Sequence, residues 1–166
     1  MTNPDLIVTA LLAPESLLEY SEMDWDLLIR QGRRANLRAR LAHLLIRIGL
    51  IDELPLSPRL HLISALRMVE RQDVAIRWEV TCIQKALAKV GVPIILLKGA
   101  AYVMAGVPAA HGRTFSDIDI LVPKNRLADV ESELMLHGWH GSHHDDYDQQ
   151  YYRRWMHELP PMQHLH

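Results

Sequence analysis

Apolar residues recur at helical spacing along the middle of the chain. They step alternately by four and three positions, which places them on one face of a helix. Asp73 is the single polar residue in this seam, which comprises positions 62, 66, 69, 73, 76, 80, 83, 87 and 90. Ser57 and Pro58 suit the first turn of such a helix, and Gly91 suits its end. The pattern predicts one long amphipathic helix over 57–91, whose seam packs within the chain, against a partner helix, or against a second copy of the chain.

The residues before this helix also have helical patterning. Ser21 and Asp24 have the spacing of a capping box, in which each side chain accepts a hydrogen bond from the backbone N–H of the other residue. Apolar residues at positions 37, 41, 44 and 48 then recur at helical spacing up to Gly49. These features predict an N-terminal helical segment over 1–56.

The pattern changes after Gly91. Two short apolar runs, 92–97 and 117–122, are rich in branched side chains and predict buried strands. The Ala-rich residues 99–106 predict a short helix between them. The amphipathic helix that follows is marked by Leu127, Val130 and Leu134, and its end by Gly138. The polar residues 139–150 are predicted to form a loop, and no regular element is expected at the very end of the chain.

This order of elements defines the expected fold class. Strand, helix, strand and helix are typical of an α/β or α+β core. We predict an α+β fold in which an N-terminal helical region precedes a small mixed sheet flanked by helices. The expected segments are 1–56, the long helix over 57–91, and a core over 92–166 that is either whole or incomplete at its C-terminal end.

Composition narrows the class of protein. The 166 residues carry a formal net charge of −2, which offers no general attraction for nucleic acids or membranes. A single cysteine excludes a disulfide framework and a cysteine-rich metal site. No apolar run approaches the roughly 20 residues that a membrane helix needs, and the N-terminus lacks a basic, signal-like start. We therefore expect a cytoplasmic protein without membrane contact.

Two acids interrupt the second apolar run. Side chains alternate along a strand, so Asp117 and Asp119 are expected on one face and Ile118 on the other. Neighbouring carboxylates repel each other unless a positive charge lies between them. Mg²⁺ is often held by one or two carboxylates together with substrate phosphates. The pair therefore indicates a divalent metal site.

The residues that follow the first apolar run, 92–97, supply positive groups that complement the two acids. Lys98-Gly99-Ala100 joins the first predicted strand to the short helix, and the free N–H groups at a helix start favour an anion. A glycine here permits close approach of a ligand to the backbone. Lys98, or Arg113 just before the acids, can neutralise phosphate charge. The spacing is not that of a P-loop.

The string LLKGAAYVMAG, followed by RTFSDIDILVP, resembles a bacterial family of uncharacterised nucleotidyltransferases within the DNA-polymerase-β-type superfamily. The resemblance implies transfer of a nucleoside monophosphate from an NTP to an acceptor hydroxyl. It implies that Asp117 and Asp119 bind Mg²⁺ or Mn²⁺ and are catalytic. The residues that it places on the nucleotide are Gly99 and Ala100 beneath the triphosphate, with Lys98, Arg113 and Ser116 on the phosphate side.

The sequence departs from the superfamily pattern in two ways. Ala100 stands where a serine is common, and a third acid is expected on a later strand. The candidates for this third acid are Asp145, Asp146, Asp148 and Glu158; otherwise the third acid is absent or lies beyond residue 166. One alternative is therefore a catalytically degenerate module that binds nucleotides or proteins.

A cluster of arginines motivates a further alternative. Arg30, Arg33, Arg34, Arg38 and Arg40 have no acid among them and suit RNA or another polyanion. A toxin-type nucleotidyltransferase that modifies tRNA or a protein would use such a surface. Alternatively, the arginines form only a solvated helix face without a ligand.

Overall fold

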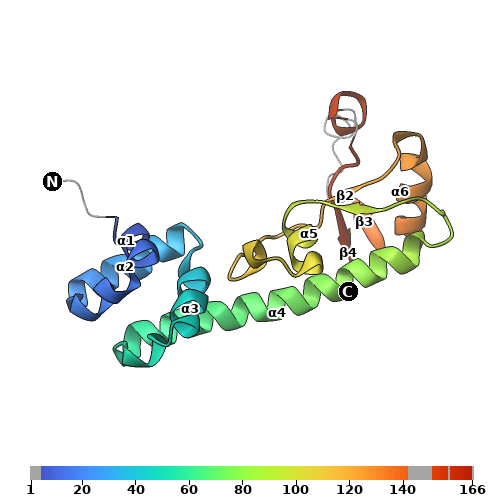
Figure 1. Cartoon of the computed structure of the whole chain (residues 1–166). Coiled ribbons are helices and arrows are strands. Elements are labelled where there is room, and N and C mark those ends of the chain that lie inside the picture. Colours follow the sequence, from blue (N-terminus) through green and yellow to red (C-terminus); the bar gives the residue numbers. More distant parts are fainter. Residues whose placement is uncertain (1–4, 142–150, 157, 166) are drawn as a thin grey trace. The chain divides into compact units, whose positions relative to one another are not determined.

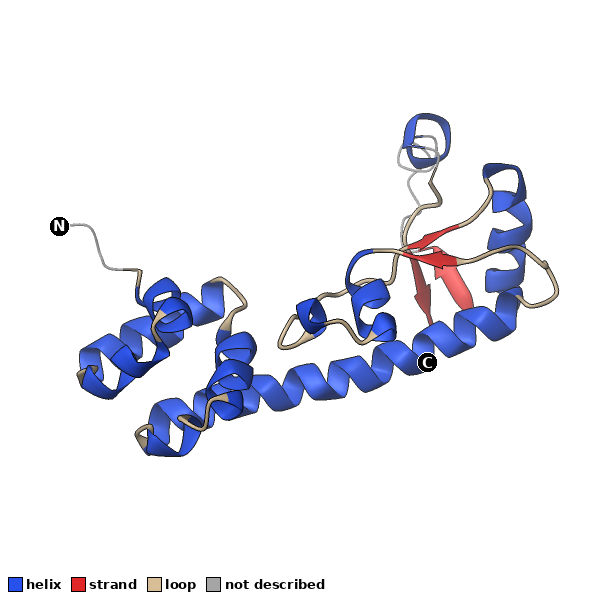
Figure 2. Cartoon of the chain, in the orientation of Figure 1, coloured by secondary structure: helices blue, strands red, loops and turns tan. Residues whose placement is uncertain are grey.

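Helices make up most of this chain, and the short strands all lie in the second half of the sequence (Figures 1 and 2). The computed structural model describes residues 5–141, 151–156 and 158–165. The fold is α+β, as predicted. The chain divides into two units, the first of Met1–Arg77 with Lys98–Asp117 and the second of Trp78–Leu97 with Ile118–His166. The long helix α4 (Leu56–Leu87) contributes residues to both units.

The first unit is helical. Its elements are α1 (Leu6–Leu12), η1 (Pro14–Glu19), α2 (Glu22–Arg34), α3 (Arg38–Arg47), η2 (Ile51–Glu53), the first part of α4 (Leu56–Leu87), α5 (Lys98–Ala105) and η3 (Pro108–Ala110). Helices α1 and α2 pack together, and both contact α3. Leu28, Leu41, Leu45 and Leu62 are fully buried in the shared core.

The predicted capping box is confirmed at the start of α2. The Ser21 hydroxyl accepts a hydrogen bond from the Asp24 N–H (3.3 Å), and the Asp24 carboxylate accepts one from the Ser21 N–H (3.0 Å). The Ser21 hydroxyl also donates to this carboxylate (2.6 Å). These bonds satisfy N–H groups that have no partner within the helix.

The long helix was predicted correctly, with small differences at its ends. It begins at Leu56 and ends at Leu87, and Gly91 lies beyond it in the left-handed region with φ of 65°. The side chains of the seam are buried or half-buried along its whole length. Leu62 joins the core of the first unit, and Ile83 and Leu87 join that of the second. The seam therefore packs within the chain.

The second unit contains two separate antiparallel sheets, so the prediction of one small mixed sheet was wrong. Its elements are the last part of α4, β1 (Ile95–Leu96), β2 (Ile120–Leu121), η4 (Lys124–Arg126), α6 (Leu127–Leu136), β3 (Trp139–Gly141), the π-helical turn η5 (Tyr151–Met156) and β4 (Met162–His164). Strand β1 pairs with β2, and β3 pairs with β4.

Strands β3 and β4 lie where no strand was predicted. Trp139 of β3 is buried, and its indole N–H donates to the Glu79 carboxylate (3.0 Å). The ring of His164 in β4 contacts the Trp139 ring, with centroids 4.3 Å apart. Strands of three residues are too short to show an alternating pattern, so their pairing depends on these non-local contacts.

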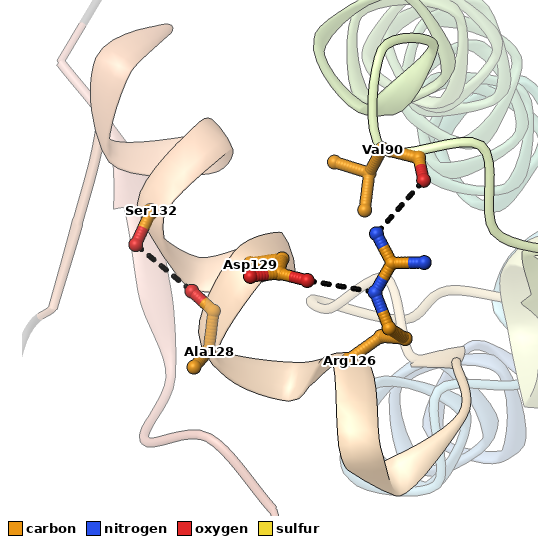
Figure 3. A network of polar contacts seen from close by, with 5 residues as sticks. All are labelled: Val90, Arg126, Ala128, Asp129 and Ser132. Carbon is orange, nitrogen blue, oxygen red and sulfur yellow. Dashed lines mark hydrogen bonds and ion pairs between the residues drawn. The ribbon is translucent and has the colours of Figure 1, made fainter.

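A small polar network connects η4 and the start of α6 to the turn that follows α4 (Figure 3). The Arg126 guanidinium donates to the Asp129 carboxylate (2.7 Å) and to the Val90 carbonyl (3.0 Å). Val130 and Leu134 of α6 are buried against Ile83 and Leu87. These contacts build the core on which β2 also packs. Among the described residues, no helix has the length and apolar character needed to cross a membrane.

Candidate functional site

Lys98 begins helix α5 in a strained conformation. Its φ is 50°, in the left-handed region that residues other than glycine, asparagine and aspartate rarely adopt. This conformation costs roughly 1–2 kcal/mol for a residue with a Cβ atom. Glycine would adopt it at almost no cost. A lysine at this position adds an exposed positive side chain to the start of a helix, where the backbone dipole is also positive.

Gly99 is required by a packing contact. A Cβ atom on this buried residue would lie 2.4 Å from Cγ of Phe115, far inside the van der Waals distance. The carbonyl of Phe115 also accepts a hydrogen bond from the Gln72 side chain of α4. The segment that leads into Ser116 and Asp117 is therefore anchored on the Lys98-Gly99 turn and on α4.

This contact explains the glycine at position 99 differently from the sequence analysis. The sequence suggested a glycine that admits a ligand, whereas the structure uses the missing side chain to admit an aromatic ring. Ala100 is also buried, with 1% of its surface exposed. A role for these two residues beneath a triphosphate stays a prediction.

The pairing of β1 with β2 fixes the backbone position of Asp119. The Leu97 N–H donates to the Asp119 carbonyl (2.9 Å), which extends the pairing by one residue beyond Leu96 and Ile120. Ile118, Ile120 and Val122 pack on the core of the second unit. Asp119 alternates with them and is half-buried.

The two strands are shorter and more exposed than predicted. The runs 92–97 and 117–122 form paired strands only at Ile95–Leu96 and Ile120–Leu121, and both aspartates precede the second strand. Ile95 is 54% exposed and Leu121 is 52% exposed, so the prediction of buried strands was wrong. The core covers only one face of this two-stranded sheet.

The other predicted site residues belong to the first unit. Ser116 and Asp117 are exposed on the loop that follows Phe115. Arg113 is also exposed, and its guanidinium carbon lies 5.4 Å from the centre of the Tyr102 ring of α5. This distance is typical of a cation–π contact. It holds the guanidinium near the short helix that Lys98 begins.

Each unit holds part of the predicted motif. On one side of Lys98, Leu97 is hydrogen-bonded to Asp119, and on the other side Gly99 contacts Phe115. Within the first unit the turn packs on the residue that precedes Ser116 and Asp117, and within the second unit Leu97 pairs with Asp119. Gln72 and Phe115, which make this arrangement possible, have no motif-like signature and were not singled out from the sequence.

Asp73 is an unusual acid beside this arrangement. It is half-buried in the seam of α4, and one carboxylate oxygen has no hydrogen-bond partner among the described residues. Burial raises the pKa of Asp73, an effect opposed by the positive charge of Arg77 and by His111. Asp73 was recognisable as unusual from the sequence, because it is the only polar residue in the seam.

His43 and His111 form a pair near this acid. Their ring centroids are 4.6 Å apart. Burial lowers the pKa of His43, and the neighbouring His111, Arg47 and Arg40 lower it further. The surroundings of His43 are therefore positively charged.

The structure describes only part of the sequence in which a third acid was sought. Asp145, Asp146 and Asp148 lie outside the described residues. Glu158 is exposed, and its N–H donates to the Tyr152 carbonyl (3.0 Å). Within 5–141, 151–156 and 158–165, no group of three or more histidine, cysteine or acidic side chains is placed to hold a metal ion.

Comparison with known proteins gives one match. The model of a family described as uncharacterised nucleotidyltransferase matches residues 21–164, which include most of each unit and all of the motif residues. No curated protein and no solved structure matches the chain significantly.

Proposed function

The chain belongs to the uncharacterised nucleotidyltransferase family, and from this premise we propose that it transfers a nucleoside monophosphate from an NTP to an acceptor hydroxyl. The hydroxyl oxygen attacks the α-phosphorus and forms a new P–O bond. The bond between the α- and β-phosphates breaks, pyrophosphate leaves, and the hydroxyl proton passes to solvent or to a nearby acid. The kind of reaction follows from the family, and the acceptor, the metal and the residue roles are our proposal.

The observation that carries the proposal is the packing of Phe115 on Gly99. It brings the lysine turn against the segment that leads into Asp117. The hydrogen bond from Leu97 to Asp119 supports the same grouping from the other side of Lys98. A positive helix start would suit a phosphate chain, and two carboxylates would suit the cation that accompanies it.

Asp117 and Asp119 fit a magnesium or manganese ion by the chemistry of their oxygen donors. Two carboxylates complemented by substrate phosphates form a common protein environment for Mg²⁺. When bound, the ion would neutralise phosphate charge and favour departure of pyrophosphate. Lys98 and Arg113 would neutralise the remaining phosphate charge, and Ser116 would hydrogen-bond on the phosphate side.

The alternative is a protein that binds nucleotides without turnover. The described residues bring no third acid together with other metal-binding side chains, and Ala100 offers no hydroxyl. Both features would weaken catalysis more than binding. Binding and turnover therefore need separate measurements.

Titration calorimetry with ATP, GTP, CTP and UTP, each with Mg²⁺ or Mn²⁺, tests the proposal. We expect metal-dependent binding of at least one nucleotide and its loss in Asp117→Asn/Asp119→Asn. The matched control is Asp52→Asn/Glu53→Gln, which removes the same charge from an exposed turn of the first unit. Equal binding by both double variants would contradict the assignment. Binding without pyrophosphate release in the presence of varied acceptors would favour the degenerate alternative.

A further inference from the structure

A long stretch of the first unit carries positive charge without any acid. Between Asp26 and Asp52 there are six arginines and no aspartate or glutamate, although the whole chain has a net charge of −2. These arginines are Arg30, Arg33, Arg34, Arg38, Arg40 and Arg47. The stretch includes most of α2 and all of α3.

Few of these charges are neutralised within the unit. Arg30 forms an ion pair with Asp26 (2.5 Å). No carboxylate of the described residues forms an ion pair with Arg33, Arg34 or Arg40. Burial lowers the pKa of Arg38, and repulsion from Arg33 lowers it further. The surface therefore favours binding of an anion.

Arg40 of this stretch and Arg113 of a later loop line one cleft. It has a volume of about 420 Å³ and lies between the turn that joins α2 to α3 and the loop that precedes the aspartates. The lining residues are Ala35, Asn36, Leu37, Arg40, Gly112, Arg113 and Thr114. The side chains at its walls are therefore basic, polar or apolar, and none is acidic.

The walls of this cleft are held in place by specific contacts. One Arg40 nitrogen donates long hydrogen bonds to the carbonyls of Ala109 (3.4 Å) and His111 (3.5 Å). Gly112 has a φ of 68°, and a Cβ atom there would lie 2.5 Å from Cα of Arg40. Arg113 contacts the Tyr102 ring. The arginines are thus preorganised, which reduces the entropy lost on binding.

We propose that this cleft binds the phosphate backbone of a nucleic acid, which serves as the acceptor in the reaction of this chain. The acceptor role depends on the proposed function, whereas the binding does not. A nucleic acid fits better than a lone triphosphate because the exposed Arg33 and Arg34 at the end of α2 extend the positive surface beyond the cleft. Contacts to successive phosphates by arginines are typical of sequence-independent binding.

Fluorescence anisotropy with labelled RNA and DNA oligonucleotides, in EDTA and without NTP, tests the inference. We expect wild-type binding to weaken as salt rises, because phosphate contacts release counterions. Arg40→Ala is expected to weaken binding several-fold and to reduce the salt slope by about 1. The exposed pair Arg33→Glu/Arg34→Glu is expected to weaken it further, and Arg40→Lys to retain most of it.

The matched control is Arg67→Ala, an exposed arginine of α4 in the same unit that pairs with Glu70 (2.9 Å). Binding that is unchanged in Arg40→Ala and in Arg33→Glu/Arg34→Glu would overturn the inference. So would an equal loss in Arg67→Ala, or binding of tripolyphosphate alone through Arg40. Circular dichroism of each variant identifies any loss due to unfolding.

The two proposals can fail separately. Oligonucleotide binding in EDTA does not require the aspartates, so Asp117→Asn/Asp119→Asn should keep it. Loss of metal–nucleotide binding with retained oligonucleotide binding would affect only the proposed function of the metal site. Normal nucleotide binding with no oligonucleotide binding would refute the proposal that the cleft binds a nucleic acid.

Discussion

Helices α2 and α5 begin in opposite ways. At the start of α2, Ser21 is extended and forms a capping box with Asp24, and acids in the first turn complement the helix dipole. At the start of α5, Lys98 is in the left-handed region, and the first turn contains no acid. The first start stabilises the fold by local contacts. The second places a strained lysine where the dipole is already positive, which is consistent with the phosphate site that we propose there.

Substitution of Gly99 by alanine should have the largest effect. The added Cβ atom would overlap the Phe115 ring, and overpacking of this kind typically costs about 1–3 kcal/mol. Because Phe115 leads into Ser116 and Asp117, metal-dependent nucleotide binding should fall as well. Urea unfolding and calorimetry measure the two effects.

A double-mutant cycle gives the control for this prediction. Phe115→Ala removes the ring that the new methyl group would meet, so Gly99→Ala should cost less in that background. The two changes should therefore be non-additive. Additive losses of the free energy of unfolding would contradict the assignment of Gly99 to the contact with Phe115.

Lys98 offers the next test, because strain and charge can be separated there. Lys98→Gly and Lys98→Ala both remove the ammonium group, but only glycine accepts φ of 50° without strain. The glycine variant should be more stable than the alanine variant by about 1 kcal/mol. Both should bind Mg-NTP more weakly than the wild type.

Two outcomes would change this interpretation. Wild-type nucleotide affinity in Lys98→Gly would mean that the ammonium group does not contact the nucleotide. Equal stability of the two variants would mean that the left-handed conformation costs little. Thermal unfolding and calorimetry on the same preparations distinguish these outcomes.

Removal of the cap of α2 should have the smallest effect and should leave nucleotide binding unchanged. Ser21→Ala removes an N-cap hydroxyl, which typically costs about 1 kcal/mol. The hydrogen bond from the Ser21 hydroxyl, followed by that from its backbone N–H, lowers the pKa of Asp24 below its ordinary value of 3.8.

The pH dependence of the cap follows from this shift. A carboxylate with a lowered pKa contributes stability that is fully present above its unfolded pKa and is lost as pH falls through the folded value. The difference in melting temperature between wild type and Ser21→Ala should therefore shrink below about pH 3.8. A difference that stays constant from pH 7 to pH 3 would show that Asp24 makes no ionic contribution to the cap.

The long helix and the capping box were predictable because their signals are local or periodic. The seam of α4 repeats over nine positions, and a single exception such as Asp73 does not obscure it. The capping box depends on two residues three positions apart. The acidic pair and the lysine turn were also evident, because polar residues stand out in apolar runs.

The short strands were harder to predict, because their hydrogen-bond partners lie far away in the sequence. Strand β4 pairs with β3, and its residues His164 and Met162 have no local pattern. The extent of β1 and β2 depends on where pairing stops, which apolar runs do not reveal. The predicted mixed sheet failed for the same reason.

The sequence by itself determined the helical first part, the family, and the residue types that a phosphate and metal site requires. These depend on periodicity, capping and composition, which are properties of neighbouring residues. Only the tertiary structure decided that Gly99 accommodates Phe115, that Lys98 is strained, and that Arg40 and Arg113 line one cleft. Such features arise where distant segments meet, because steric exclusion and electrostatic repulsion depend on distance in space rather than on position in the chain.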